Sequence, residues 1–279
     1  GVFSIQDGAI TFGVMTAFLQ LVGRIQRPLS DLARMVPTLV GALTSAERLM
    51  ELEELPMESE GESIRLKGAV GVRFTDVSFM YDDGEEEVLS HLNEDFAPGS
   101  MTAVLGETGA GKTTLIRLIL ALIRPTKGCV TMYDAEREVE VSPQTRGNLV
   151  YVPQGNTLFS GSIRENLLLG NPNATDEQLW EVLRLACAEF VLSLPEGLET
   201  KCGEQGGGLS EGQAQRIAIA RSLLRQGSVL LFDEATSALD PDTERRLLQR
   251  LAEAKGGRTV IFITHRPSVL EYCDRVLRV

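Results

Sequence analysis

The most constraining feature of the sequence is the segment GETGAGKTT, which runs from Gly106 to Thr114. It follows a hydrophobic run, MTAVL, and precedes the apolar helical pattern LIRLILALI. Its first eight residues match G-x-x-x-x-G-K-[ST], a loop whose backbone N–H groups point inward at a phosphate. The helix that follows adds the positive end of its dipole. A strand, this loop and a helix in that order predict a site for the phosphates of a nucleotide.

A glycine-rich loop can also serve purposes that involve no mononucleotide. A glycine turn that only caps a helix is the simplest alternative, and the strand–loop–helix context weighs against it. A dinucleotide-binding loop is excluded, because Gly109 and Gly111 would need a third glycine where Thr114 stands. The predicted contacts to the nucleotide come from Gly106, Glu107, Thr108, Gly109, Ala110, Gly111, Lys112, Thr113 and Thr114. Lys112 would reach the β- and γ-phosphates, and Thr113 would place its hydroxyl on Mg²⁺.

Short hydrophobic runs alternate with helical patterns throughout the sequence after residue 65. The runs MTAVL, NLVYV, SVLLFD and TVIFITH predict buried strands at 101–105, 148–152, 228–233 and 259–265. The helical patterns cover 112–123, 176–194, 212–226 and 242–255. This alternation predicts an α/β domain with a largely parallel central sheet.

A pair of acids follows one of these predicted strands, in SVLLFDEATSALD at Ser228–Asp240. Asp233 would lie at the carboxyl edge of the sheet, beside the phosphate loop, and could hold Mg²⁺. Glu234 would point the other way and is the candidate general base for an attacking water. The alternative interpretation is that the two acids only begin a loop after the strand. The presence of the glycine loop in the same chain weighs against that interpretation.

The N-terminal region has a different character from the rest of the chain. Sixteen residues without a charge, Gly8–Gly23, lie between Asp7 and Arg24. A helix of that length rises about 24 Å, short of the hydrocarbon core of about 30 Å. The stretch is therefore either a short or truncated membrane span or a buried core helix. It does not resemble a signal peptide, because no basic region precedes it.

A domain boundary is indicated between this region and the α/β part. Residues 38–55 have helical spacing, Pro56 interrupts it, and MESEGES at 57–63 has the composition of a linker. Residues 1–48 hold four basic and three acidic residues, a net charge of +1. Because the whole chain has a net charge of −12, the remaining residues carry a net charge of −13. An acidic chain of this kind disfavours nucleic-acid binding.

The segment LSEGQAQR, Leu209–Arg216, resembles the signature sequence of the ATP-binding cassette (ABC) family. The resemblance covers residues 70–279 and includes several motifs in the order that the family has them. It implies a P-loop NTPase cassette with a mainly parallel central sheet, an antiparallel β subdomain and a helical subdomain. Four further motifs are similar to those of the family: Tyr81 for adenine, Gln154 for the link to the membrane partner, Ser237–Asp240 for the loop that crosses between cassettes, and His265 for the γ-phosphate.

The signature segment also fits a purely local role. Ser210 and Gln213 have the spacing of a capping box, which predicts a well-capped amphipathic helix. In the family this turn faces the γ-phosphate held by a second cassette, so the resemblance adds Ser210, Gly212 and Gln213 to the ATP site. Glu211 departs from the family, which most often has glycine there, and we expect it to tune affinity without abolishing binding.

The resemblance implies a complete set of catalytic roles. Glu234, His265, Lys112 and Gln154 would take part in catalysis, and Thr113, Gln154 and Asp233 would hold Mg²⁺. The expected activity is ATP hydrolysis, with ATP and Mg²⁺ bound between two cassettes. We expect a homodimer, and a heterodimer remains open.

The N-terminal region is similar to the last membrane helix and cytoplasmic extension of ABC exporters. This predicts residues 1–56 as the end of a membrane domain that precedes the cassette in the same chain, 57–66 as a linker, and 67–279 as the nucleotide-binding domain. The membrane domain, the membrane and a second cassette are then the expected partners, and no nucleic acid is expected. The predicted location is the cell membrane, as in a bacterial inner membrane, with the cassette on its cytoplasmic face. The alternative is a soluble ABC ATPase that acts on nucleic acid or ribosomes, and a nucleotide-binding module without turnover is a third possibility.

Overall fold

The computed structural model describes residues 11–55, 57–58, 61–81, 84, 86–107, 109–155, 157–203 and 207–279. The chain divides into two compact units, Gly1–Glu58 and Ser59–Val279. The division falls within the range 57–66, which the sequence predicts to be a linker. The assignment of 1–56 to a membrane domain stays a prediction.

The described part of the first unit is one long helix, α2 (Phe12–Glu54). Its N-cap is Thr11, whose hydroxyl accepts a hydrogen bond from the Val14 N–H at 3.3 Å. The helix contains Pro28 and Pro37 and buries none of its residues. Residues 8–10 of the uncharged stretch lie outside the described residues. Over the part of the chain that is described, no helix combines the length and the apolar character needed to cross a membrane.

The second unit is built around a five-stranded sheet with the strand order β11-β3-β10-β9-β6. All four neighbouring pairs are parallel, which confirms the predicted parallel sheet. The strands are β3 (Met101–Leu105), β6 (Leu149–Val152), β9 (Val229–Asp233), β10 (Thr259–Ile263) and β11 (Arg275–Arg278).

Both faces of this sheet are buried, and successive side chains enter two different hydrophobic cores. Leu230 and Phe232 of β9 pack into one core, whereas Val229 and Leu231 pack into the other. A strand buried on both faces has no polar side to alternate with, so its sequence is a continuous apolar run. This is the reason that SVLLFD and TVIFITH could be predicted as buried strands.

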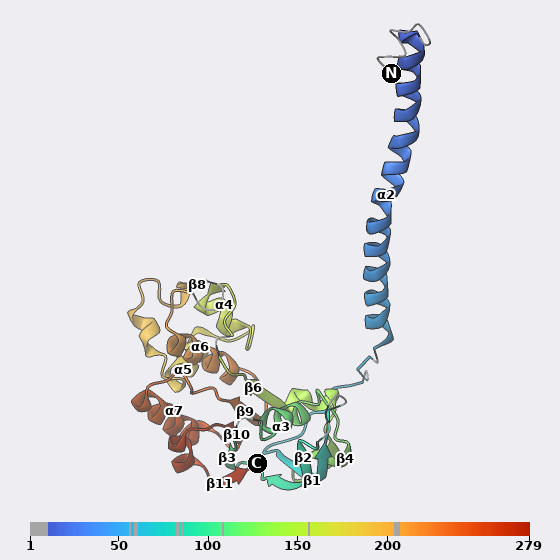
Figure 1. The fold of residues 1–279 in the computed structure, drawn as a ribbon. Helices are drawn as coiled ribbons and strands as arrows, with labels where there is room; N and C mark the ends of the chain where they lie inside the picture. The colour runs from blue at the N-terminus through green and yellow to red at the C-terminus, as the bar shows by residue number, and fades with distance from the viewer. Residues whose placement is uncertain are drawn as a thin grey trace. The chain divides into compact units, whose positions relative to one another are not determined.

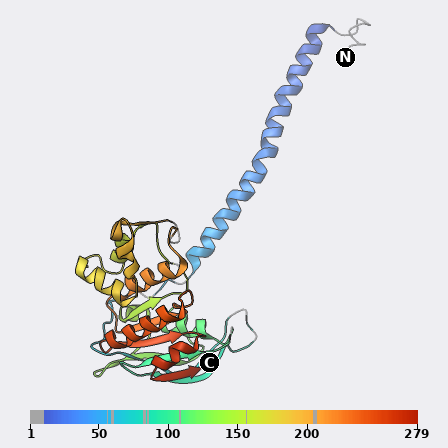
Figure 2. The same ribbon diagram turned by 90° about the vertical axis from the view of Figure 1, so that its left-hand side faces the viewer.

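Helices share one hydrophobic core with one face of the sheet (Figure 1). They are α4 (Ile163–Leu168), α5 (Asp176–Leu185), α6 (Glu211–Leu223) and α7 (Pro241–Ala254). β7 (Gly161–Ser162) precedes α4, and η2 (Glu189–Ser193), η3 (Gly197–Glu199) and β8 (Lys201–Cys202) lie between α5 and α6. The short helix η5 (Pro267–Tyr272) lies between β10 and β11. Figure 2 shows α4 to α6 gathered at one end of the unit, where α6 also packs against β6. These helices form the predicted helical subdomain.

The other face of the sheet packs against α3 (Lys112–Ile119) and a second sheet. That sheet has the order β2-β1-β4-β5 and only antiparallel pairs, which confirms the predicted antiparallel β subdomain. Its strands are β1 (Gly71–Phe79), β2 (Leu89–Phe96), β4 (Lys127–Tyr133) and β5 (Glu138–Glu140), and η1 (Pro143–Asn148) follows them.

Two predicted helices are shorter than the sequence pattern indicated. The helix predicted at 112–123 ends at Ile119, because Ala121 adopts a left-handed φ of 52° and the Leu122 N–H bonds to the Arg117 carbonyl. This arrangement of a left-handed residue and a long backward hydrogen bond ends a helix.

The helix predicted at 176–194 is also wrong in extent, since α5 ends at Leu185. Cys187 has a φ of 54°, and the Ala188 N–H bonds back to the Leu183 carbonyl at 2.7 Å. The turn is itself buried, so its apolar residues continued the helical pattern in the sequence although the helix had stopped.

Candidate functional site

The phosphate loop joins β3 to α3, as the sequence predicted. Gly109 and Gly111 have φ values of 92° and 91°, a region that side chains with a Cβ rarely adopt. At Gly111 a Cβ would also lie 2.8 Å from Leu89 Cδ2, so glycine is required there twice over. Lys112 Nζ donates to the carbonyls of Gly106 and Glu107, at 2.6 and 2.8 Å. The lysine therefore curls back over the loop that it follows. Thr108 lies outside the described residues.

Tyr81 lies against the helix that follows the loop. Its hydroxyl is 3.2 Å from Thr114 Oγ1 and accepts a hydrogen bond from Arg117 at 2.9 Å. Its ring packs edge to face on Phe79, with the ring centres 4.8 Å apart. The structure thus brings Tyr81 to the end of the phosphate loop. Arg117 was not singled out from the sequence, where it is one more polar position of a helix.

Asp233 ends β9 and is held by a residue that no sequence motif singled out. The hydroxyl of Tyr151, on the neighbouring strand β6, donates to Asp233 Oδ2 at 3.0 Å. Burial raises the pKa of Asp233, and the charge of Glu234 acts in the same direction. The Tyr151 hydrogen bond and the charge of Lys112 oppose that rise in pKa. The positive charge of Lys112 therefore acts electrostatically on Asp233, although β10 separates β9 from β3 in the sheet.

Glu234 forms the centre of a second group of polar side chains. Its Oε2 accepts from Gln154 Nε2 at 3.1 Å, and its Oε1 lies 3.5 Å from His265 Nδ1. The Glu234 side chain is 22% exposed and that of His265 is 64% exposed, so the cluster opens to solvent on the histidine side. The three residues follow β6, β9 and β10, which are neighbours in the sheet. The carboxyl ends of parallel strands meet at one edge, and this edge is where such sheets bind ligands.

The backbone at Glu234 is unusual. Its φ is 46°, a left-handed value for a residue that is not glycine. Its N–H donates to the Ile263 carbonyl at 2.9 Å, which attaches this turn to β10. The turn directs consecutive carboxylates to different partners, Asp233 to Tyr151 and Glu234 to Gln154 and His265.

The signature segment forms the predicted capping box at the start of α6. The Gln213 N–H donates to Ser210 Oγ at 3.2 Å, and the Ser210 N–H donates to Gln213 Oε1 at 2.9 Å. A Cβ at Gly212 would lie 2.7 Å from the Ala238 carbonyl oxygen, so this glycine allows α6 to pack closely on the loop 237–240. Among the described residues, no hydrogen bond joins Ser210 or Gln213 to the phosphate loop.

The donor set agrees with a magnesium site. Thr113, Gln154 and Asp233 offer a hydroxyl, an amide carbonyl and a carboxylate, and Mg²⁺ binds oxygen ligands of this kind. Within the described chain, no group of three or more His, Cys, Asp or Glu residues could hold a metal by itself. That finding is compatible with Mg²⁺, because Mg²⁺ commonly uses one or two carboxylates together with substrate phosphates and water. The glycine loop and Lys112 likewise suit a polyphosphate.

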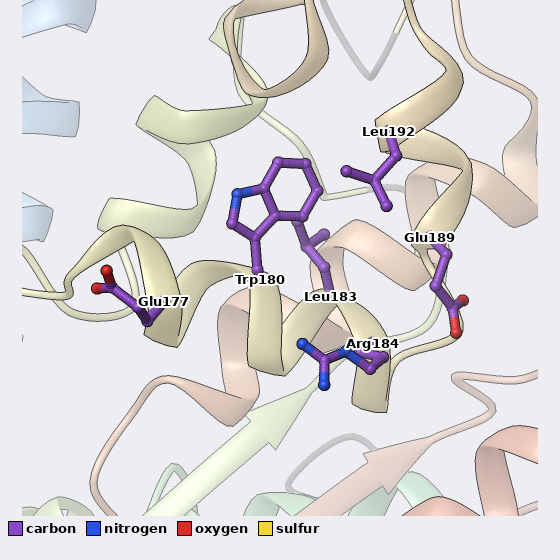
Figure 3. Close-up of a pocket in the computed structure, with 6 residues that line it drawn as sticks. All are labelled: Glu177, Trp180, Leu183, Arg184, Glu189 and Leu192. Carbon is purple, nitrogen blue, oxygen red and sulfur yellow. The ribbon is translucent and has the colours of Figure 1, made fainter.

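A cavity of about 410 Å³ lies elsewhere, between α5 and η2. Figure 3 shows Trp180 extending from α5 toward the segment that carries Leu192. The lining mixes these apolar side chains with Glu177, Arg184 and Glu189. None of the predicted site residues lines it, so it has no part in the nucleotide site.

Comparison with models of protein families matches residues 89–237 to the family described as ABC transporter. The match includes the phosphate loop, Gln154, the signature segment and the acid pair. A model described as an AAA domain, putative AbiEii toxin, Type IV TA system, also matches residues 207–271.

Curated relatives extend the likeness over almost the whole chain. An uncharacterized ABC transporter ATP-binding protein of Sinorhizobium fredii is 38% identical over 99% of this chain and 48% of its own length. The ATP-dependent lipid A-core flippase of Chromohalobacter salexigens is 37% identical over 96% of this chain and 47% of its own length. The chain spans about half the length of the curated relatives it matches.

A solved structure of a bacterial Atm1-family ABC exporter with ATP bound is similar to the chain as well. The two share 32% sequence identity and a TM-score of 0.75, over 92% of this chain and 46% of the exporter chain.

Proposed function

Since this chain belongs to the ABC transporter family, we propose that it is the ATP-binding and ATP-hydrolysing part of an exporter. Pairing of two such cassettes around ATP would drive movement of a substrate across a membrane. The observation that carries the proposal is the cluster of Gln154, Glu234 and His265, which lies at the carboxyl edge of the sheet that also carries Asp233 and the phosphate loop. Its relatives named as a flippase and an exporter favour transport over a soluble ABC ATPase that acts on nucleic acid.

The phosphate loop and the acid pair would hold the nucleotide. Lys112 exchanges the carbonyls of Gly106 and Glu107 for phosphate oxygens, since an ammonium group bonds more strongly to an anion than to a neutral carbonyl. When bound, Mg²⁺ would supply positive charge that offsets the negative charge of the phosphates. Thr113, Asp233 and Gln154 would hold it. The ring of Tyr81 would support the adenine.

Glu234 would act as the general base. Its carboxylate is oriented by Gln154 at one oxygen and lies near His265 at the other. A carboxylate held in this way can orient a water molecule and accept its proton. His265 can donate a hydrogen bond to developing negative charge on the γ-phosphate, which stabilises the transition state. Gln154 would report the state of the site to the membrane domain.

Ser210 completes the site from a second cassette. Its turn makes no hydrogen bond to the described residues of the phosphate loop in its own chain, and the start of α6 suits an anion. We therefore assign Ser210, Gly212 and Gln213 to the nucleotide of a partner cassette, in a homodimer or with a different chain. Residues 1–56 would connect the cassette to its membrane domain, with the cassette on the cytoplasmic face of the cell membrane.

The substitution Glu234→Gln tests the proposal. It keeps the shape of the side chain but removes the base, so the ATPase rate of the purified full-length protein should fall about 10²–10⁴-fold. Binding of ATP should stay close to that of the wild type. Glu253→Gln, at an exposed position of α7, is the matched control and should leave the rate unchanged. A Glu234→Gln protein that hydrolyses ATP at the wild-type rate would contradict the proposal.

A further inference from the structure

Arg266 directly follows His265 and reaches into a loop far away in the sequence. Its NH2 donates to the Ser237 carbonyl at 2.7 Å, and its NH1 donates to the Leu239 carbonyl at 3.0 Å. Both carbonyls belong to the loop 237–240. The side chain is only 26% exposed, so these contacts lie largely out of solvent. One guanidinium therefore holds two backbone groups of that loop against the residue next to His265.

The same guanidinium also faces a buried carboxylate. Glu244 of α7 is 2% exposed, and its Oε2 lies 3.2 Å from Arg266 NH1. The hydroxyl of Ser268 donates to the same oxygen at 2.6 Å. Glu244 Oε1 has no hydrogen-bond partner within the described residues. Arg266 and Ser268, which follow His265 in the chain, thus both bind the carboxylate of Glu244. Glu244 belongs to α7, the helix that begins directly after the loop 237–240.

The geometry requires arginine in particular. A guanidinium presents five N–H donors in a rigid plane, so it can bond two carbonyls and a carboxylate at once. Lysine has a single ammonium nitrogen and cannot reproduce this spread of contacts.

The loop held by Arg266 touches the signature helix as well. The Ala238 N–H donates to Gln215 Oε1 at 3.1 Å, and its carbonyl lies against Gly212. Gln215 and Gly212 belong to α6, whose N-cap is Ser210. The contacts therefore run from His265 through Arg266 and the loop 237–240 to the turn that carries Ser210.

From these contacts, and resting on the function proposed above, we propose that Arg266 is a positioning residue for ATP hydrolysis. It attaches the segment that carries His265 to the loop 237–240. This attachment fixes the position of His265 relative to the turn that carries Ser210. Arg266 touches neither nucleotide nor water in this scheme. It acts through His265 and the loop, and its loss should lower turnover while leaving ATP binding intact.

The first test is Arg266→Ala in the full-length protein, with kcat, KM and ATP affinity measured separately. We expect kcat to fall about tenfold to a hundredfold, the range for a small displacement of catalytic groups. ATP affinity by calorimetry should be unchanged. Arg266→Lys should recover only part of kcat, because it restores charge without the planar fork. Full kcat in either variant would overturn the inference.

A second variant separates positioning from stability. Arg266→Ala leaves the buried carboxylate of Glu244 without its cation, which destabilises a protein strongly. Combining it with Glu244→Gln removes the stranded charge, so the melting temperature should return toward that of the wild type. The turnover number should remain low, because the bonds to Ser237 and Leu239 are still missing. Recovery of kcat together with the melting temperature would show that Arg266 is merely structural and overturn the inference.

Two controls complete the design. Arg245→Ala removes an exposed arginine of α7 that pairs with Asp242, and it should leave kcat unchanged. Glu234→Gln, purified and assayed in the same way, tests the proposed function independently. If Glu234→Gln is inactive and Arg266→Ala has full activity, only the inference about Arg266 fails.

Discussion

The residues Asp233 and Glu234 show how two adjacent carboxylates can acquire different surroundings. Asp233 ends a buried strand, where burial raises its pKa and Tyr151 donates a hydrogen bond to it. Glu234 occupies a left-handed turn that directs its carboxylate to Gln154 and His265 instead. Such a backbone conformation costs about 1–2 kcal/mol in a residue with a Cβ, and it persists here because the Glu234 N–H is bonded to β10. The separation of environments supports separate roles as cation ligand and base.

Lys112 provides a prediction at the residue scale. Its ammonium group bonds to two carbonyls of the phosphate loop, and under the proposed function it binds the phosphates of ATP. Lys112→Ala should remove a charge-assisted hydrogen bond of about 1.5–3 kcal/mol and weaken ATP binding about tenfold or more. Isothermal titration calorimetry with ATP and Mg²⁺ measures the change.

The control for this prediction is Lys67→Ala, which removes an exposed lysine that pairs with the exposed Glu136. It should bind ATP with unchanged affinity. Equal ATP affinity in Lys112→Ala and the wild type would count against the phosphate-loop assignment.

Among the helices, α6 has two possible roles for its first turn, and the sequence is consistent with both. Ser210 is both a confirmed N-cap and the candidate contact to the nucleotide of a partner. The structural role depends on a side-chain oxygen that accepts the Gln213 N–H, and serine, asparagine and aspartate all supply one. The binding role depends in addition on the charge of the side chain at position 210, because a negatively charged side chain there would repel the phosphates of the nucleotide.

This difference allows the two roles of Ser210 to be tested separately. Ser210→Asp and Ser210→Asn should both keep the cap and leave the melting temperature close to that of the wild type. Ser210→Asp should lower ATPase activity far more than Ser210→Asn, since only the aspartate repels the phosphates. Thermal unfolding and ATPase assays of both variants give the comparison. Equal activity of the two variants would mean that Ser210 only caps α6.

The ends of α3 and α5 show a limit of sequence patterns at the element scale. Both helices stop at non-glycine residues with positive φ, Ala121 and Cys187. Alanine and cysteine have no preference for that conformation, so nothing in the sequence marks these positions. The Arg146 side chain donates to the Leu120 and Ala121 carbonyls, and Arg250 donates to the Arg184 carbonyl. Tertiary contacts thus satisfy the exposed ends of both helices.

For the molecule as a whole, the proposed site combines parts that no hydrogen bond joins within the described residues of one chain. The phosphate loop, Asp233 and Glu234 share one edge of the sheet, whereas Ser210 is engaged with its own helix. Under the proposed function, hydrolysis should require two cassettes. The specific ATPase activity should rise with protein concentration until pairing is complete, as mass action requires.

This prediction can be checked by measuring the rate across a range of concentrations. Light scattering of the Glu234→Gln protein with ATP and Mg²⁺ should give the mass of a dimer, because the nucleotide binds but is not consumed. A constant specific activity from a protein of monomeric mass would contradict the requirement for a second cassette.

The sequence alone determined the chemistry of this protein to a large extent. The phosphate loop, the acid pair, the capping box and the four buried strands are local patterns, set by residues close together in the chain. Spacing and residue type are sufficient to recognise them, because glycine freedom, strand burial and cap geometry act over a few residues.

Which of these parts meet depends on the three-dimensional fold. The strand order placed β10 between β3 and β9, joined Tyr151 to Asp233, and brought Gln154 and His265 to opposite oxygens of Glu234. It also placed Arg266 against Ser237, Leu239 and Glu244. Such contacts depend on how strands pair and helices pack across long separations in sequence, and no local pattern of residues encodes them.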